Sequence, residues 1–101
     1  MGGNEQNYVD EAFKTNWIAP LGPNVNLFEE AIEKYVGQKI QVAALSAGTA
    51  AIHLALEILG VSKDDEVLCQ SFTFSASANP IMYLGATPIF VDSERDTWNI
   101  C

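Results

Sequence analysis

An alternation of predicted strands and helices, which begins at Lys39, is the feature that most restricts how this chain can fold. The predicted strands are residues 42–45, 66–70 and 87–91, and the predicted helices are residues 49–59 and 74–84. Apolar runs indicate the strands, and Gly60 and Gly85 mark the ends of the helices. Strands that alternate with helices build a parallel sheet covered on both faces. The sequence therefore predicts an α/β fold, although three strands make a small sheet.

Residues 1–38 differ in pattern and predict a helical arm with an apolar loop. A helix is expected over about residues 5–15 with Asn4 as its cap, and a second from Asn24 or Asn26 to Val36, where Gly37 ends it. The prolines and glycine of residues 20–23 forbid a helix between them. We therefore expect two parts, residues 1–38 and residues 39–101, the second being the incomplete start of a larger α/β domain.

The turn at residues 45–51, Leu-Ser-Ala-Gly-Thr-Ala-Ala, lies between a predicted strand and a predicted helix. A helix start presents unpaired backbone N–H groups and the positive end of the helix dipole, which suit a phosphate or carboxylate. Gly48 lets a ligand approach the backbone, and Thr49 can donate a hydroxyl or cap the helix. The alternative is that Gly48 and Thr49 only cap the helix.

Charge and composition exclude several classes of function. Five basic against thirteen acidic residues give a net charge of −8, which argues against nucleic acid or an anionic membrane as a partner. No apolar run is long enough to span a bilayer. Cys69 and Cys101 form no metal-ligand pattern, and Cys69 is expected to be a reduced core thiol of a cytoplasmic protein. We expect no metal site.

Other titratable residues are better explained by structure than by chemistry. His53 lies in the middle of an apolar helix, where a packed or half-exposed imidazole is more common than a base. Residues 64–66 read as a solvated acidic turn rather than a metal site. The acidic residues at 92, 94 and 96 follow the third predicted strand, where open α/β sheets place ligands. We interpret them as part of a connecting segment rather than a ligand site.

Three segments together resemble the DegT/DnrJ/StrS family of nucleotide-sugar aminotransferases, which are fold-type I pyridoxal-phosphate enzymes. The segments are residues 46–56 (SAGTAAIHLAL), residues 65–79 and residues 84–100. The residues near positions 1–5 and 17–22 resemble most the branch that aminates UDP-linked 4-keto-sugars of the bacillosamine type. The resemblance covers nearly the whole chain, but only about the first quarter of a typical member.

The resemblance implies the N-terminal part of an aspartate aminotransferase-like large domain, with a mostly parallel sheet flanked by helices. It implies pyridoxal 5′-phosphate as cofactor, nucleotide-sugar and amino-acid substrates, a homodimer and a cytoplasmic location. The cofactor phosphate would lie at Gly48, Thr49 and Ala50, and the pyridine ring against Phe74; plain core packing is the alternative for Phe74. Phe72 is expected in the core, and Asn79 is expected to satisfy backbone rather than touch the cofactor.

The resemblance also shows what the chain lacks. The family's cofactor-binding lysine and ring-nitrogen aspartate lie well downstream of the matched part, and none of Lys14, Lys34, Lys39 or Lys63 has a matching context. We therefore assign no catalytic residue and expect no amino transfer by these 101 residues alone. The resemblance further implies that residues 42–45 cannot pair with residues 66–70. Alternatives are a sugar dehydratase that uses pyridoxamine phosphate and a truncated, non-catalytic module that binds an anion or a partner.

Overall fold

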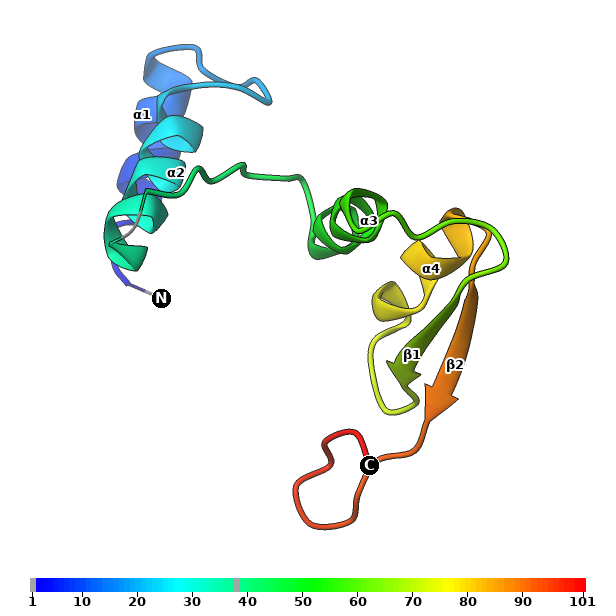
Figure 1. The fold of residues 1–101 in the computed structure, drawn as a ribbon. Helices are drawn as coiled ribbons and strands as arrows, with labels where there is room; N and C mark the ends of the chain where they lie inside the picture. The colour runs from blue at the N-terminus through cyan, green and yellow to red at the C-terminus, as the bar shows by residue number, and fades with distance from the viewer. Residues whose placement is uncertain (1, 38) are drawn as a thin grey trace. The chain divides into compact units, whose positions relative to one another are not determined.

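The structure is a computed structural model that describes residues 2–37 and 39–101 (Figure 1). The chain forms two compact units, Met1–Ala44 and Leu45–Cys101. Compact units within this chain need not coincide with the domains of a longer protein, so the division between residues 38 and 39 stays a prediction.

Two helices, α1 (Glu5–Lys14) and α2 (Pro23–Val36), make up most of the first unit. Helix α1 begins where the sequence predicts, with Asn4 at its N-cap position, but the Asn4 side chain makes no capping bond. The Glu5 carboxylate instead accepts hydrogen bonds from the N–H groups of Gly2 and Gly3, the latter at 2.8 Å. A carboxylate at the start of a helix also complements the helix dipole.

Helix α2 begins before either predicted asparagine, because Pro23 occupies its first turn. Proline suits this position, since its fixed φ is helical and its missing N–H would have no partner there. The helix ends as predicted at Gly37, whose φ of 71° is left-handed. In the loop before α2, a Cβ on Gly22 would lie 3.1 Å from Cε3 of Trp17, so glycine lets the backbone approach this ring. The Trp17 side chain is 50% exposed.

The strand predicted at residues 42–45 does not form. These residues are neither helix nor strand, and the only ladder in the described residues pairs β1 with β2. Val42 and Ala44 donate their N–H groups to carboxylates of α2 instead, to Glu33 Oε1 at 2.9 Å and Glu29 Oε1 at 2.7 Å. An apolar run indicates that a segment is buried, but it does not indicate which strand, if any, pairs with it. The expectation that this segment does not pair with residues 66–70 agrees with the structure.

A parallel pair of strands, β1 (Glu66–Gln70) and β2 (Thr87–Val91), forms the sheet of the second unit. Glu66 pairs with Thr87 and Gln70 with Val91. Helix α3 (Gly48–Ile58) precedes β1, and the short helix α4 (Asn79–Tyr83) connects β1 to β2 (Figure 1). Both α3 and β2 contact α4. This strand–helix–strand unit confirms the predicted α/β fold.

The helix predicted over residues 74–84 is interrupted. A 3₁₀ turn at Ser75–Ser77 comes first, and the α-helical part starts only at Asn79. Pro80 explains the break, since proline supplies no N–H and is tolerated in the first turn of a helix but not in its interior. The helix ends as predicted before Gly85, whose φ is 76°.

The core of the second unit is small. Its buried residues are Cys69, Ile81 and Ala86, with 7%, 2% and 3% of their surface exposed. Cys69 is a free thiol inside this core, as predicted. Many large apolar side chains are exposed, Leu59 at 78% among them. Within the described part of the chain, no helix is both long and apolar enough to cross a membrane.

After β2 the chain closes a loop through an antiparallel bridge between Ser93 and Ile100. Gln70 of β1 donates from Nε2 to Ser93 Oγ at 2.9 Å and to the carbonyl of Trp98. The Trp98 ring lies 5.1 Å from the Phe72 ring, centroid to centroid. Phe72 is 65% exposed in this chain, so its predicted core position is wrong: its contact is an aromatic partner at the surface.

Candidate cofactor-binding site

The start of α3 presents free backbone donors. Ala47 is extended, with φ −161° and ψ 158°, and Ala51 is the first residue whose N–H bonds back, to the Ala47 carbonyl at 3.1 Å. Among residues 2–37 and 39–101, no acceptor bonds the N–H groups of Gly48, Thr49 and Ala50, and no side chain caps the helix. Thr49 therefore does not cap its own helix, and three donors are left for a ligand.

Gly48 has no structural need to be glycine in this chain. Its backbone is not left-handed, and a Cβ built on it would meet no atom within 4 Å. Gly37, Gly60 and Gly85, in contrast, have φ values of 71°, 82° and 76° that disfavour other residues. A glycine with helical backbone and open space around it fits a close approach by a ligand. The residues present thus fit a phosphate.

Phe74 precedes the 3₁₀ turn and is 80% exposed. Core packing within this chain therefore does not account for it. An exposed aromatic ring offers a flat face on which a planar ligand can stack. The 3₁₀ turn that Phe74 precedes contacts α3, whose N-terminus carries the free donors.

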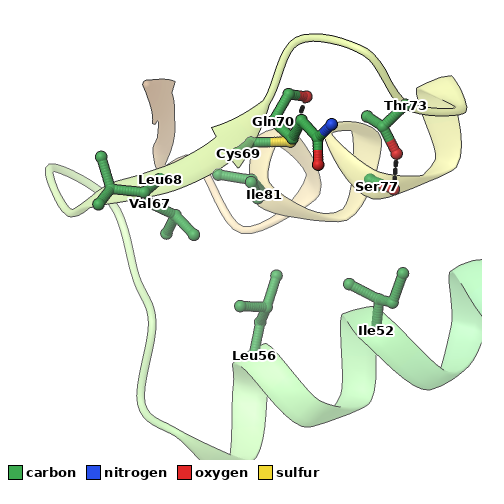
Figure 2. Close-up of a pocket in the computed structure, with 9 residues that line it drawn as sticks. All are labelled: Ile52, Leu56, Val67, Leu68, Cys69, Gln70, Thr73, Ser77 and Ile81. Atoms are coloured by element: carbon green, nitrogen blue, oxygen red, sulfur yellow. Dashed lines mark hydrogen bonds between the residues drawn. The ribbon is translucent and has the colours of Figure 1, made fainter. Parts of the chain in front are cut away.

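An open hollow of about 310 Å³ lies between α3 and β1 (Figure 2). Leu56 of α3, Val67 of β1 and Ile81 of α4 give it an apolar lining. Its polar end carries Thr73 and Ser77, whose hydroxyl oxygens lie 2.9 Å apart (Figure 2). Ile52, in the N-terminal half of α3, lines the same hollow, so the residues next to Phe74 lie near that half of the helix. No pattern in the sequence predicted this hollow.

Of the other candidate residues, only His53 has a packing partner that explains it in the described part of the chain. His53 packs edge-on against Tyr83, with ring centroids 5.5 Å apart, as expected for a packed helix residue. Asn79 starts α4, but its side chain makes no hydrogen bond within the described residues, so the expectation that it satisfies the backbone is wrong. In the same part of the chain, no group of three His, Cys, Asp or Glu residues could hold a metal ion.

Comparison with known proteins places these features in a family. Residues 1–101 match the DegT/DnrJ/EryC1/StrS aminotransferase family. The chain is 61% identical to EpsN of Bacillus subtilis, assigned as a pyridoxal phosphate-dependent aminotransferase, and 43% identical to a GDP-perosamine synthase of Caulobacter vibrioides. Each match covers 99% of this chain but only 26% and 27% of those relatives.

The fold agrees with that comparison. The structure matches an assigned sugar aminotransferase, Spr1654 of Streptococcus pneumoniae in its PLP form, with a TM-score of 0.83 and 31% identity. This match covers 99% of the chain and 25% of Spr1654. The predicted resemblance and the predicted fold, the N-terminal part of a pyridoxal-phosphate aminotransferase large domain, are thus confirmed. The chain belongs to the DegT/DnrJ/EryC1/StrS aminotransferase family.

Proposed function

We propose that this chain is the N-terminal part of a pyridoxal-phosphate aminotransferase that moves an amino group from an amino acid, glutamate, to a keto-sugar nucleotide. The observation that carries the proposal is the set of three unbonded N–H groups at the start of α3, next to a glycine with open space around it. The names of the relatives, GDP-perosamine synthase among them, support the same reaction class.

In this proposal the N–H groups of Gly48, Thr49 and Ala50 hold the cofactor phosphate, and the Thr49 hydroxyl adds a further donor. The exposed Phe74 ring orients the cofactor by stacking against its pyridine ring. Pyridoxal phosphate, once bound, supplies the electron sink that amino transfer requires. The chain's own residues bind and orient; the lysine that moves the proton is assigned to the sequence beyond residue 101.

The partners follow from the same assignment. The substrates are a keto-sugar nucleotide and an amino acid, the enzyme acts in the cytoplasm, and the working unit is a homodimer. A role in polysaccharide biosynthesis is supported by SpsC of Bacillus subtilis, a spore coat polysaccharide biosynthesis protein that is 41% identical to this chain. The preference for a UDP-linked rather than a GDP-linked sugar stays a prediction.

The test is an amino-transfer assay on the full-length protein with pyridoxal phosphate, glutamate, and UDP- or GDP-linked 4-keto-sugars. We expect cofactor absorbance, product formation and loss of both in Gly48→Pro. Proline suits this position, because Ala47 before it is extended and no intrahelical bond is lost. Ile58→Ala, at the opposite end of α3 and 76% exposed, is the control that keeps both. A full-length protein that binds no pyridoxal phosphate would refute the proposal.

A further inference from the structure

The segment of residues 71–74, which joins β1 to the 3₁₀ turn, is fixed at its start by contacts with β2 and the loop after it. The N–H of Ser71 donates to the carbonyl of Val91 at 2.8 Å. The next residue, Phe72, places its ring 5.1 Å from the ring of Trp98, with the two planes tilted by 49°. An aromatic pair at this spacing stabilises its arrangement beyond the area that it buries. Two consecutive residues of the segment are thus held from outside it.

The second half of the segment is held by the 3₁₀ turn. The hydroxyl oxygens of Thr73 and Ser77 lie 2.9 Å apart (Figure 2). The carbonyl of Phe74 accepts the N–H of the same Ser77, also at 2.9 Å. These bonds fix the Phe74 backbone in an extended conformation, with φ −70° and ψ 140°, while the Phe74 ring stays 80% exposed. The segment therefore holds the main chain of this residue and leaves its ring accessible to a ligand.

Trp98, the partner of Phe72, has a backbone conformation that a bulky side chain disfavours. Its φ of 63° is left-handed, and the other non-glycine residues of the described chain with positive φ, Asn16 and Asp64, are of types that tolerate this region. Such a conformation persists only where surrounding contacts determine it. Gln70 supplies two of them, because its Nε2 donates to the Trp98 carbonyl and, at 2.9 Å, to Oγ of Ser93 in the same loop.

We propose that Trp98 is a positioning residue for Phe74, an inference that rests on the proposed function. Gln70 holds the loop after β2, and Trp98 of that loop contacts Phe72. Only Thr73 separates Phe72 from Phe74, so a fixed Phe72 leaves the Phe74 backbone few alternative conformations. The Phe74 ring is thus oriented before the cofactor stacks on it, which lowers the ordering cost of binding. This role also accounts for a strained backbone at Trp98, which lies outside the core.

The experiment measures, in the full-length protein, the Kd for pyridoxal phosphate and the amide hydrogen exchange of Ser77, whose N–H bonds the Phe74 carbonyl. Trp98→Ala should raise the Kd about two- to tenfold, the loss of one aromatic pair, and should speed this exchange in the cofactor-free protein. Trp98→Phe keeps a ring and should restore most of the affinity. Tyr83→Ala is the matched control, because it removes the other aromatic pair of this unit, with His53, and should leave both readouts unchanged.

A double-mutant cycle distinguishes positioning from a general effect on stability. If Trp98 acts through Phe74, Trp98→Ala should raise the Kd no further in a protein that already carries Phe74→Ala, because the ring that it positions is gone. An equal loss of affinity with and without the Phe74 ring would mean that Trp98 supports the cofactor by another route. That result would overturn the inference.

The outcomes also separate this inference from the proposed function. If the unmodified protein binds no pyridoxal phosphate, the proposed function fails and the inference fails with it. If the unmodified protein binds the cofactor and Trp98→Ala binds it equally tightly, the inference alone is refuted. Should Trp98→Ala not fold, Gln70→Met keeps the length of the side chain and removes the donor that holds the loop. Unchanged Ser77 exchange and unchanged Kd in this variant would likewise overturn the inference.

Discussion

Replacing Gly48 with alanine tests whether this glycine is needed for the fold or for binding a ligand. Gly48 is the first residue of α3, and a Cβ there would meet no atom within 4 Å. Its backbone is not left-handed, so alanine fits without strain. Because alanine lowers the conformational entropy of the unfolded chain, Gly48→Ala should raise the free energy of unfolding of the cofactor-free protein by about 0.4–1 kcal/mol.

Cofactor binding should change in the opposite direction. The added methyl group lies beside the three N–H groups that we assign to the phosphate, and displacing the phosphate loses at least one hydrogen bond to a charged group. Such a bond contributes about 1.5–3 kcal/mol, so the Kd for pyridoxal phosphate should rise at least about tenfold. Urea unfolding without cofactor and a spectroscopic titration with cofactor measure the two effects separately.

Gly60→Ala is the matched control, because Gly60 follows the other end of the same helix. A Cβ there also meets open space, but the φ of 82° makes alanine unfavourable by about 1–2 kcal/mol. This variant should lose stability and keep its cofactor affinity. A Gly48→Ala protein that is less stable than the original, or that binds the cofactor as tightly, would refute the reasoning.

Three further predictions concern the core, the ring and the loop after β2. Ile81→Ala should lower the free energy of unfolding by about 2–5 kcal/mol in urea denaturation, because Ile81 is 2% exposed in a small core. Phe74→Ala should change the free energy of unfolding by less than about 0.5 kcal/mol, since Phe74 is 80% exposed. The same variant should weaken cofactor binding in the spectroscopic titration. The Thr97 hydroxyl and backbone N–H groups lower the pKa of Glu94, so the loop should loosen in amide exchange as pH falls below 4.5.

The sign of the pH effect follows from that direction. A carboxyl group whose pKa is lowered by folding stabilises the folded loop fully above the ordinary value and loses this contribution as pH falls through the lowered value. Glu94→Gln should abolish the dependence, and a loop that loosens equally in this variant would contradict the assignment. Unchanged stability of the Ile81→Ala protein would contradict the prediction for the core. Unchanged cofactor affinity of the Phe74→Ala protein would contradict the prediction for the ring.

Local signals in the sequence predicted much of the second unit. The strands at Glu66–Gln70 and Thr87–Val91 have the predicted bounds, and Gly60 and Gly85 follow the helices as expected. Glycine supplies the left-handed backbone that ends a helix, a requirement met by the residue itself. The free N–H groups at the start of α3 were also predictable from local sequence, because every helix start has such groups.

Predictions that depend on distant neighbours were less successful. The apolar run at residues 42–45 has the composition of a strand, but the described chain offers it no strand to pair with. The carboxylates that bond it, Glu29 and Glu33, lie 15 and 9 residues away from their partners along the chain. Their spacing of four fits any exposed helix face, so the sequence carries no signal for these bonds. The core position predicted for Phe72 was wrong, because aromatic character alone does not distinguish a residue of the core from one that contacts another ring at the surface.

Each compact unit carries one of the two tryptophans of the chain, and this gives the protein a built-in pair of optical reporters. Trp17 lies against Gly22 in the first unit with 50% of its surface exposed, and Trp98 lies beside Phe72 in the second with 59% exposed. Indole emission shifts to shorter wavelength when water is removed. The single-tryptophan variants Trp17→Phe and Trp98→Phe would therefore show, unit by unit, which surface becomes covered when a ligand or a partner binds.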